Sequence, residues 1–345
     1  MRPLLIIFSL VFIQFYQTGS CQTNPVTDEM TFMFYNTENF FDSEDDSLTT
    51  DDEFTSNADR RWNSGRMHAK AERLGKVILA AGKWNPPVFA GLCEIENLHV
   101  LELLTSMEPL KKYQYKIVQK DSPDRRGIDV ALIYRPDLFN PYEYQAIEVK
   151  DSIDISFKTR DILRVSGVFN QCDTLHVFVN HWPSRFGGLM KTVKYRKLAA
   201  ETLKNSIREI QIKFSKAKII CMGDFNDGPT EESMLHFLGA KKADNPTIKG
   251  EMINLSMEWI TDQVQTIKSL YSWEVFDQLI VSDYFIEKND CYDLPKAEIL
   301  KAGFLLEPDI KYGGVKPKRT YLGYKYQEGF SDHLPVLLRV RNLNH

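Results

Sequence analysis

Several apolar runs in this chain end or begin at a polar side chain of a kind that does acid, base or metal chemistry. Polar groups follow four runs at Asn36, at Glu94, at His181 and at Asp224 with Asn226, and they precede two runs at Asp277 and at Ser331, Asp332 and His333. If the first four runs are strands that point one way and the last two point the other way, all six groups lie at one edge of the sheets. The pattern therefore predicts one site.

The residue types at this site suit metal-assisted attack of water on a phosphoester. The oxygen donors Asn36, Glu94 and Asp332 fit magnesium, with manganese as an alternative, because both ions prefer carboxylate, carbonyl and water ligands. The chain has few thiols or paired histidines, which disfavours zinc. A divalent ion would shield the negative phosphoester oxygens and stabilise the charge that develops in the transition state.

The remaining polar residues have types that suit the proton transfers of such a reaction. Asp224 and Asn226 form a neighbouring acceptor and donor that could hold a water in line with the leaving oxygen. His181 and His333 could donate hydrogen bonds to phosphate oxygens, and Asp277 would fix the tautomer of a partner imidazole. We therefore predict catalytic roles for these five residues.

Strands and helices are needed to carry these groups. Short apolar runs of β type predict strands at 30–35, 88–93, 128–134, 174–179, 218–222, 276–281 and 335–340. Apolar residues spaced three and four apart predict a helix over 67–81, which Pro86 and Pro87 would stop, and a second helix is predicted over 193–214.

Composition limits the class of protein. The 345 residues are 43% hydrophobic and 26% charged, an ordinary globular balance with no repeat and no linker rich in proline or serine after residue 30. We predict a single domain over 30–341, preceded by a linker over 21–29. The first twenty residues contain Arg2 as their one charge, and without them 42 basic and 47 acidic side chains leave a formal charge of −5. A strongly basic nucleic-acid coat is therefore excluded.

The N-terminus has the pattern of an export signal. Arg2 precedes the apolar stretch LLIIFSLVFIQF, which is too short to span a membrane, so residues 1–20 are predicted to be a signal peptide. Cleavage after Ser20 is favoured, and lipidation of Cys21 is left open because Thr18 stands where a lipobox prefers leucine. No later stretch predicts an integral membrane span. We expect a protein that is periplasmic, extracellular or an outer-surface lipoprotein.

Two other features were given non-catalytic interpretations. The stretch 42–53 holds seven carboxylates but lacks the ligand pattern of an EF-hand, so a solvated loop is favoured over a calcium site. Cys93 and Cys221 lie in apolar runs and are predicted to be small buried hydrophobes. No cysteine pairing is predicted.

Longer motifs resemble a known family. They are YNTENFFD at 35–42, the strand end at Glu94, GDFN at 223–226, FDQLIVS at 276–282 and SDHLPV at 331–336. Their types and order resemble those of the endonuclease/exonuclease/phosphatase superfamily, which includes deoxyribonuclease I, over residues 31–341. RGIDVALIYRP at 126–136 and NHWPSR at 180–185 resemble its exported bacterial members.

The resemblance implies a fold and a set of roles. The fold is a four-layer α/β sandwich, in which two largely antiparallel or mixed β-sheets are packed face to face and flanked by helices. The resemblance implies metal binding by Asn36 and Glu94 with Asp332 in the same region. It also implies that Asp224 and Asn226 orient or activate the water, that His181 and His333 (paired with Asp277) bind the scissile phosphate, and that Arg160 is the phosphate-binding arginine. The identity of the base and the number of metals stay open.

Other groups near the motifs have less definite roles. The resemblance implies a carboxylate partner for His181, and Asp129 is the candidate, although Ile128 lies nearest that position. Arg185 is predicted to bind substrate. The cluster Lys311, Lys316, Lys318 and Arg319 could steer an anionic substrate, although such clusters are usually solvated faces.

These observations predict a secreted, magnesium-dependent phosphoesterase that acts as a monomer on phosphodiester bonds, with nucleic acid as its first substrate class. The alternative is a phosphatase or phosphodiesterase that acts on a small or lipid phosphoester. A third hypothesis, a catalytically silent binding protein, is disfavoured because no predicted metal ligand or phosphate-binding histidine is missing.

Overall fold

The computed structural model describes residues 29–243, 249–287, 290–293 and 295–343. The predicted signal peptide over 1–20, the possible lipidation site Cys21 and all but the last residue of the predicted linker lie outside the described residues.

Two large mixed β-sheets form the centre of the molecule. The six-stranded sheet has the order β14 (Lys296–Ile299), β19 (Val336–Arg341), β1 (Glu29–Phe40), β2 (Phe89–Ile95), β4 (Asp129–Tyr134) and β3 (Lys116–Gln119). The seven-stranded sheet has the order β5 (Phe139–Ile147), β6 (Ile162–Phe169), β7 (Asp173–His181), β8 (Lys218–Asp224), β13 (Asp277–Ser282), β10 (Met252–Asn254) and β9 (Ala240–Lys241). In both sheets the strands that carry the predicted site lie in the middle.

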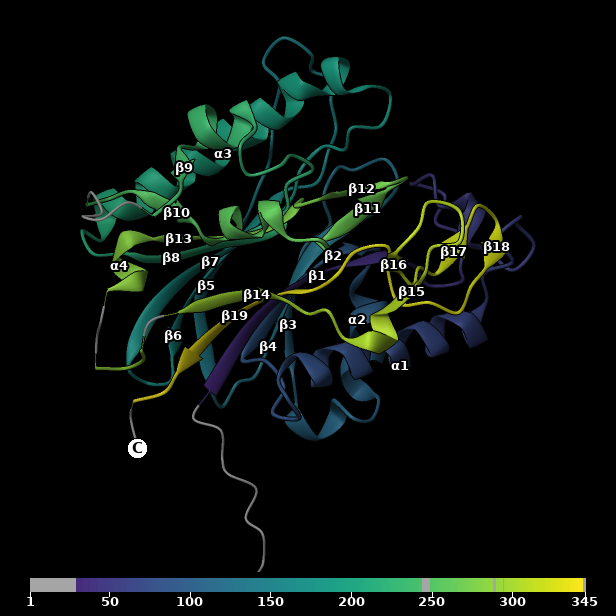
Figure 1. Cartoon of the computed structure of the whole chain (residues 1–345), viewed down its shortest axis with the longest axis horizontal. Helices are drawn as coiled ribbons and strands as arrows, with labels where there is room; N and C mark the ends of the chain where they lie inside the picture. Colours follow the sequence, from purple (N-terminus) through teal and green to yellow (C-terminus); the bar gives the residue numbers. More distant parts are fainter. Residues whose placement is uncertain (1–28, 244–248, 288–289, 294, 344–345) are drawn as a thin grey trace, which may run out of the picture.

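Helices cover the outer faces of the two sheets. They are α1 (Ser64–Ala81), α2 (Leu98–Ser106) and α3 (Leu189–Lys213), whereas the single turn α4 (Asp283–Ile286) places Phe285 in the central core. Figure 1 shows α3 beyond β7, β8 and β13 at the top, and α1 and α2 on the opposite side near β1 to β4. The order helix, sheet, sheet, helix confirms the predicted four-layer α/β sandwich.

Short elements complete the chain. The small hairpins are β11 (Ile267–Ser269) with β12 (Ser272–Glu274), β15 (Leu306–Pro308) with β16 (Val315–Pro317), and β17 (Tyr321–Leu322) with β18 (Lys325–Tyr326). Short 3₁₀ or π helices lie at Asp52–Phe54, Lys111–Tyr113, Ser233–Leu238, Leu255–Thr261 and Gly303–Leu305.

Alternation of side chains along the strands builds two cores. Ile220 and Met222 of β8 face the other sheet and join the central core, whereas Ile219 and Cys221 face outward. The outward set packs with one apolar face of α3, which contains Ala199, Leu203, Ile207 and Ile210. Because successive residues of a strand point to opposite faces, an unbroken apolar run such as 218–222 serves both cores.

The predicted helices begin earlier than their apolar spacing indicates. The helix predicted over 67–81 begins at Ser64, because the Asn63 side chain accepts a hydrogen bond from the Arg66 amide and caps the first turn. The helix predicted over 193–214 spans Leu189–Lys213. Helix α2 was not predicted; its short apolar segment follows the cap Asn97, which accepts from the Val100 amide.

All seven predicted strands are present, within a few residues of their predicted ends. Six described strands of the two sheets were not predicted: β3, β5, β6, β9, β10 and β14. β5 lies at the sheet edge, is mostly exposed and contains Pro141, so it has no apolar run. β6 is interrupted by Arg164, whose charge is accommodated because it pairs with Glu143 at 2.9 Å.

The structure tests the predictions for the cysteines and for the acidic stretch 42–53. Cys172 and Cys291 form a disulfide. Cys93 and Cys221 are buried, as predicted, and they are free thiols. Most of the stretch 42–53 is solvated, but the prediction is wrong at Asp51, which is buried. The stacked rings of Phe41 and Phe54 hold the two ends of this stretch against the core.

Among the described residues, every helix is too short or too polar to cross a bilayer.

Candidate active site

Strand pairing brings the polar strand ends together. In the parallel pair β7 and β8, His181 is opposite Asp224, and in the antiparallel pair β8 and β13, Asp224 is opposite Asp277. In the other sheet β1 and β2 are parallel, so Asn36 and Glu94 lie at the same end. β19 runs antiparallel to β1, which places His333, just before it, at that end too.

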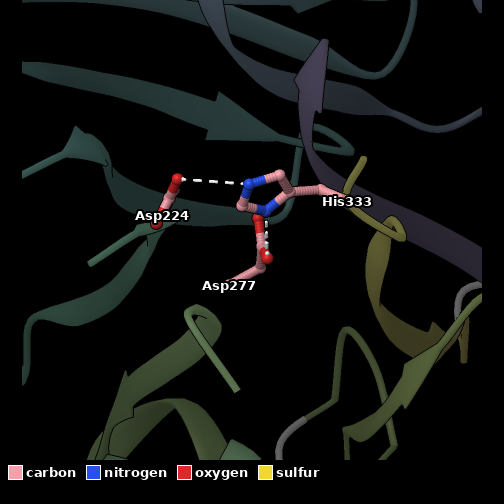
Figure 2. Close-up of side chains that lie close together, drawn as sticks. All are labelled: Asp224, Asp277 and His333. Atoms are coloured by element: carbon pink, nitrogen blue, oxygen red, sulfur yellow. Dashed lines mark hydrogen bonds and ion pairs between the residues drawn. The ribbon is translucent and has the colours of Figure 1, made fainter. Parts of the chain in front are cut away.

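Asp224, Asp277 and His333 form the centre of the site. Nδ1 of His333 lies 2.7 Å from Oδ2 of Asp277, and Nε2 of the same ring lies 3.8 Å from Oδ2 of Asp224 (Figure 2). All three side chains are almost fully buried. The imidazole is thus held between two carboxylates that come from neighbouring strands of one sheet, while the histidine belongs to the other.

Asn36, Glu94 and His181 extend this centre. The Asn36 amide nitrogen lies 3.1 Å from Asp224 Oδ2 and 3.4 Å from Glu94 Oε1. Nε2 of His181 lies 3.7 Å from Asp224 Oδ2 and 3.9 Å from Glu94 Oε1. Six of the predicted residues therefore surround one point, and Asp224 contacts or faces most of the others.

Four residues at the site have a left-handed backbone conformation, which residues other than glycine seldom adopt. Glu38, Asn39, Glu94 and Asn226 all have φ between 52° and 58°. Such left-handed residues cost free energy and persist only where surrounding contacts hold them. Here the Asn39 amide donates to Glu94 Oε2, and the Asn226 amide donates to Asp224 Oδ1. The unusual backbone thus aims amide donors at the two carboxylates.

A hydroxyl fixes His333 relative to the first sheet. The Ser331 side chain donates to the Asn36 carbonyl at 2.7 Å and accepts from the His333 amide at 3.0 Å. Because these are short-range contacts in a buried position, they restrict how far the imidazole can move from Asn36.

His333 and Asp224 carry opposite charges, which their neighbours and their burial determine. Burial opposes the positive charge of His333, but Asp277 and Asp224 outweigh it and raise the pKa of this imidazole well above its ordinary value. Burial and Asp277 raise the pKa of Asp224 to about 6, against the lowering effect of His333. At neutral pH, His333 is therefore a cation and Asp224 is mostly a carboxylate.

His181 has the opposite character. Burial, with smaller effects from Arg160 and Arg126, lowers the pKa of His181 well below its ordinary value, so this ring is neutral. Its Nδ1 atom is buried without a hydrogen-bond partner among the described residues. A neutral imidazole carries one N–H, which can donate a hydrogen bond to an incoming oxygen.

The predicted carboxylate partner of His181 is not Asp129. One oxygen of Asp129 accepts from the Gln119 side chain at 3.0 Å and the other accepts from the Ser122 amide at 2.8 Å. These contacts hold the loop after β3, so this weakly supported assignment is wrong. The carboxylates nearest to His181 are instead Glu94 and Asp224.

Arg160 and Asn226 are joined through one backbone carbonyl. The Trp182 carbonyl accepts from Arg160 Nη2 at 2.6 Å and from the Asn226 amide nitrogen at 3.1 Å. Arg160 also pairs with Asp124 at 3.1 Å and is almost fully buried. Both residues thus contact the backbone of Trp182, the residue after His181, and their predicted roles stay predictions.

Arg185 is engaged in a separate network. It pairs with Asp227, Glu231 and Glu274 at 3.1 to 3.4 Å, and its guanidinium lies over the Phe276 ring. Asp227 in turn pairs with the buried Arg196 at 2.7 Å. In this arrangement Arg185 holds the loop after β8 rather than presenting free donors, and its predicted substrate contact stays a prediction.

Asp332 lies next to the site but faces a cation of the chain itself. Its Oδ2 atom accepts from Arg319 Nη2 at 2.9 Å, and Arg319 Nε also donates to Glu38 at 3.1 Å. Lys316 pairs with Glu307 at 3.4 Å. Of the predicted basic cluster, Arg319 is thus the member that reaches the site.

Three residues of the site region, Glu38, Lys70 and Asp124, were not predicted. Glu38 lies two residues after Asn36 in the motif YNTENFFD, and a carboxylate at that spacing was available as a signal. Lys70 occupies the apolar face of α1, where a single charged residue among alanines and leucines marks a buried partner. Asp124 lies in a loop and gave no signal.

The site has the donors that a divalent metal needs. The ligand atoms of Asp224, Asp277 and His333 lie within 4.8 Å of one another, and the acidic and histidine groups could hold a metal ion. Because His333 Nδ1 already contacts Asp277, we assign these three to proton transfer and phosphate binding. The carboxylate oxygens of Glu94 and Asp224 face the same space and suit a hard cation. Asn36 directs its nitrogen there, so its direct ligation of a metal stays a prediction.

Comparison with known proteins identifies the class. The chain belongs to the endonuclease/exonuclease/phosphatase family, whose model matches residues 31–342. This confirms the resemblance derived from the motifs. The family comprises hydrolases of phosphoesters, so the chain is a phosphoesterase of this family. No match was found among curated protein sequences.

Solved structures share the fold at low identity. A mannosyl-6-phosphatase from Bacteroides thetaiotaomicron is 16% identical, with a TM-score of 0.56 over 90% of this chain and 99% of that one. Truncated TDP2 from Caenorhabditis elegans is 14% identical, with a TM-score of 0.54 over 91% and 97%. The human Nocturnin catalytic domain is 14% identical, with a TM-score of 0.53 over 91% and 95%. At such identities the likeness establishes the fold alone.

Proposed function

We propose that this chain is an exported, magnesium-dependent hydrolase that cleaves phosphoesters by in-line attack of water. The observation that carries the proposal is the position of Asp224, which lies within 4 Å of both His181 and His333 and hydrogen bonds to Asn36. A base, a neutral donor and a cationic donor around one point are the groups that phosphoryl transfer requires.

Each residue then has one step. Asp224 accepts a proton from the attacking water, whose oxygen bonds to phosphorus while the bond from phosphorus to the leaving oxygen breaks. The leaving oxygen takes a proton from solvent and departs as an alcohol. His333, a cation held by Asp277, and the neutral His181 donate to the phosphate oxygens and stabilise their added charge. Asn226 positions the water beside Asp224, to which its backbone amide is bonded.

Glu94 would hold the divalent cation, with Asn36 beside it and Asp224 facing the same space. When bound, the ion supplies positive charge that shields the phosphoester oxygens. We propose magnesium, with manganese as an alternative, because the donors are carboxylate and amide groups rather than thiolates.

Nucleic acid is the substrate class that the motifs favour. A second candidate is a small or lipid phosphoester, and the pairing of the basic residues supports it. Arg160, Arg185 and Arg319 each contact at least one carboxylate at 3.2 Å or less, so these three arginines offer little unpaired positive charge to a polyanion. The fold is also that of a mannosyl-6-phosphatase, which widens the second candidate to sugar phosphates.

Export is supported by the Cys172 to Cys291 disulfide. Such bonds form and persist in oxidising compartments and are rare in the cytosol. Together with the apolar N-terminal stretch, this observation supports a proposed location in the periplasm, at the outer surface or outside the cell.

The test is hydrolysis by the purified chain without residues 1–20, in magnesium or in chelator. The substrates are supercoiled DNA, RNA, an inositol phosphate, mannose 6-phosphate, sphingomyelin and a chromogenic phosphodiester. We expect hydrolysis of at least one substrate, its loss in chelator and its loss in Asp224→Ala and His333→Ala. Activity that survives chelation and both substitutions would contradict the mechanism.

The same panel separates the two substrate classes. Cleavage of DNA or RNA with little turnover of the small compounds would support a nuclease. Turnover of a small or lipid phosphoester at a kcat/KM about 100-fold above that for nucleic acid would support the second candidate, since this difference corresponds to about 2.7 kcal/mol in transition-state binding.

A further inference from the structure

The acidic stretch 42–53 closes over a carboxylate that comes from another strand. Asp42, at the start of the stretch, donates its backbone amide to Glu96 Oε2 at 2.6 Å. Asp51, near the end, has its carboxyl within hydrogen-bonding reach of the Glu96 carboxyl. Glu96 directly follows β2, and its amide donates to the Phe40 carbonyl of β1 at 3.2 Å. The loop 42–51 is thus gathered around one acidic side chain.

Asp51 and Glu96 are both buried, and one of their oxygens has no partner. Asp51 is 2% exposed and Glu96 is 8% exposed. Oδ2 of Asp51 accepts from the Asp46 amide at 3.2 Å, whereas its Oδ1 atom is buried and receives no hydrogen bond from any described residue. Buried polar atoms are nearly always paired, and an unpaired buried charge is costly. Two carboxyl groups that meet in this way need positive charge between them, from a proton or from a cation.

The chain does not supply that charge from its own side chains. The stretch 42–53 contains no lysine or arginine. Among the residues that the structure describes, one of the seven carboxylates of the stretch has an ion pair, that of Glu53 with Arg60 at 2.9 Å. Asp42, Asp51 and Glu96 make hydrogen bonds but no ion pair within the described chain. Because like charges repel and burial strengthens the repulsion, a divalent cation suits this loop better than one shared proton.

The loop is held in place from outside, so its oxygen atoms are already gathered. The Trp62 ring nitrogen donates to the Phe41 carbonyl at 3.0 Å, and the Phe41 ring stacks on Phe54. In the middle of the loop, the Thr50 amide donates to the Arg125 carbonyl at 2.8 Å. Calcium accepts six to eight oxygen ligands in a flexible arrangement, whereas magnesium demands a near-ideal octahedron. An irregular acidic loop therefore fits calcium better.

Glu96 and Glu94 serve different ends of this segment. Glu94 Oε2 accepts from the Asn39 amide, and Glu94 Oε1 lies near the Asn36 side chain. Glu96 instead contacts Asp42 and Asp51. The two carboxylates thus have separate sets of partners. The spacing within the stretch favours a solvated loop, because the carboxylate that completes the buried pair belongs to a distant part of the chain.

We propose that the loop 42–51 and Glu96 bind a calcium ion, apart from the catalytic centre, with the carboxylates of Asp51 and Glu96 as ligands. Asp42 adds negative charge beside them. The ion holds the end of β1 against the end of β2, and with it the segment that carries Asn36. It does not contact the reacting atoms, and this inference does not depend on the proposed hydrolysis.

Calorimetric titration with calcium tests the site in the purified chain without residues 1–20. The substitution Glu94→Gln is present throughout, so that binding at the catalytic centre is weakened. We expect one calcium ion per chain and weaker binding of magnesium. Adding Asp51→Asn or Glu96→Gln should raise the dissociation constant for calcium by about tenfold or more. Asp52→Asn, at the exposed neighbouring carboxylate, is the matched control and should leave it unchanged.

Thermal unfolding gives a second readout whose sign depends on calcium. In chelator, Asp51→Asn should unfold at a Tm equal to or above that of the wild type, because it removes one of two facing buried charges. In excess calcium the wild type should gain Tm and the variant should not, since a ligand that binds the folded state stabilises it. A variant that is less stable in chelator, with no response to calcium in either chain, would overturn the site and leave Asp51 a structural role.

The remaining outcomes separate this site from the catalytic one. Calcium binding that appears in the wild type but is lost with Glu94→Gln would assign the ion to the catalytic centre and overturn a separate site. Equal binding by the Asp51→Asn and Asp52→Asn chains, or magnesium binding as tight as that of calcium, would also overturn it. If Asp51→Asn does not fold, Glu96→Gln decides by the same titration. Hydrolysis in magnesium, with its own substitutions, tests the proposed function independently.

Discussion

Asp224 and His333 lie in surroundings that move their pKa values in ways that suit opposite tasks. The carboxylate of Asp224 is buried beside Asp277, which makes it a stronger base than an exposed aspartate. The imidazole of His333 is kept charged by the carboxylates on both sides. Asp224 can therefore accept a proton while His333 stabilises negative charge in the same step.

Asp277→Asn should lower kcat by about 10²- to 10⁴-fold, the usual contribution of such acid–base groups. The substitution removes the negative charge that holds the His333 proton and orients the ring through Nδ1. The pKa of His333 should fall, which an NMR titration of the histidine rings would detect. Asp173→Asn, at the other end of β7 where Asp173 pairs with Lys218, is the control. Equal losses in both variants would indicate a general structural effect.

Activity should rise with pH through about 6, because Asp224 must be a carboxylate to accept the proton and its pKa is raised to about 6. A bound cation would move this limb lower. The sign for stability is opposite: the folded carboxyl holds its proton more tightly than the unfolded one, so this group makes the fold less stable as pH rises from about 4 to 6. A profile of kcat/KM from pH 4 to 8 that is flat would contradict Asp224 as the base.

The central strands carry the site, and a disulfide bond holds chain segments away from it. The turn between β6 and β7 is tied by the Cys172 to Cys291 disulfide to the segment between α4 and β14, 119 residues away in sequence. This bond joins an end of one sheet to the chain that leads into the other. It lies at the opposite end of β7 from His181, so its contribution is to stability.

The double substitution Cys172→Ala and Cys291→Ala should lower the free energy of unfolding by about 2–4 kcal/mol, since a long loop in the unfolded chain is no longer closed. Urea unfolding monitored by circular dichroism measures this loss. Reductant should destabilise the wild type and leave the double variant unchanged. At 25 °C kcat should stay within about twofold. A large loss of activity in the folded variant would show that the bond also positions the site.

For the molecule as a whole, the distance between the two sheets decides whether the site forms, because His333, Asn36 and Glu94 come from one sheet and His181, Asp224 and Asp277 from the other. Gly91 of β2 faces side chains of the other sheet. A Cβ atom there would lie 2.8 Å from Met222 Sδ and 3.2 Å from Val179. The missing side chain thus permits the close packing.

Gly91→Val should destabilise the fold by about 1–3 kcal/mol and lower kcat, because overpacking separates the sheets and the two halves of the site with them. Thermal unfolding and kcat of the folded variant measure the two effects. Gly303→Ala is the matched control, since a Cβ atom there meets nothing within 4 Å. Loss of stability with an unchanged kcat would mean that the site tolerates a shift between the sheets.

Much of the site could be predicted because its signals are local. A strand that ends at Glu94 or Asp224 can be recognised from an apolar run followed by an abrupt polar residue, and this signal does not depend on which strands pair. The order of the motifs then indicated the family and the sandwich. The same reasoning missed β5, α2 and the burial of Asp51, where neighbours rather than local pattern set the environment.

The pairings that complete the site join residues far apart in the chain, and nothing in a local pattern reports them. Arg319 and Glu38 are 281 residues apart in the sequence. Asp129 does not pair with His181, because both of its carboxylate oxygens accept hydrogen bonds from Gln119 and Ser122. Amino-acid type sets which chemistry a side chain can do. Strand register, rotamer and burial determine which partner a side chain meets, and therefore which charge it carries. All three depend on the packing of the whole chain, so only the tertiary structure decides them.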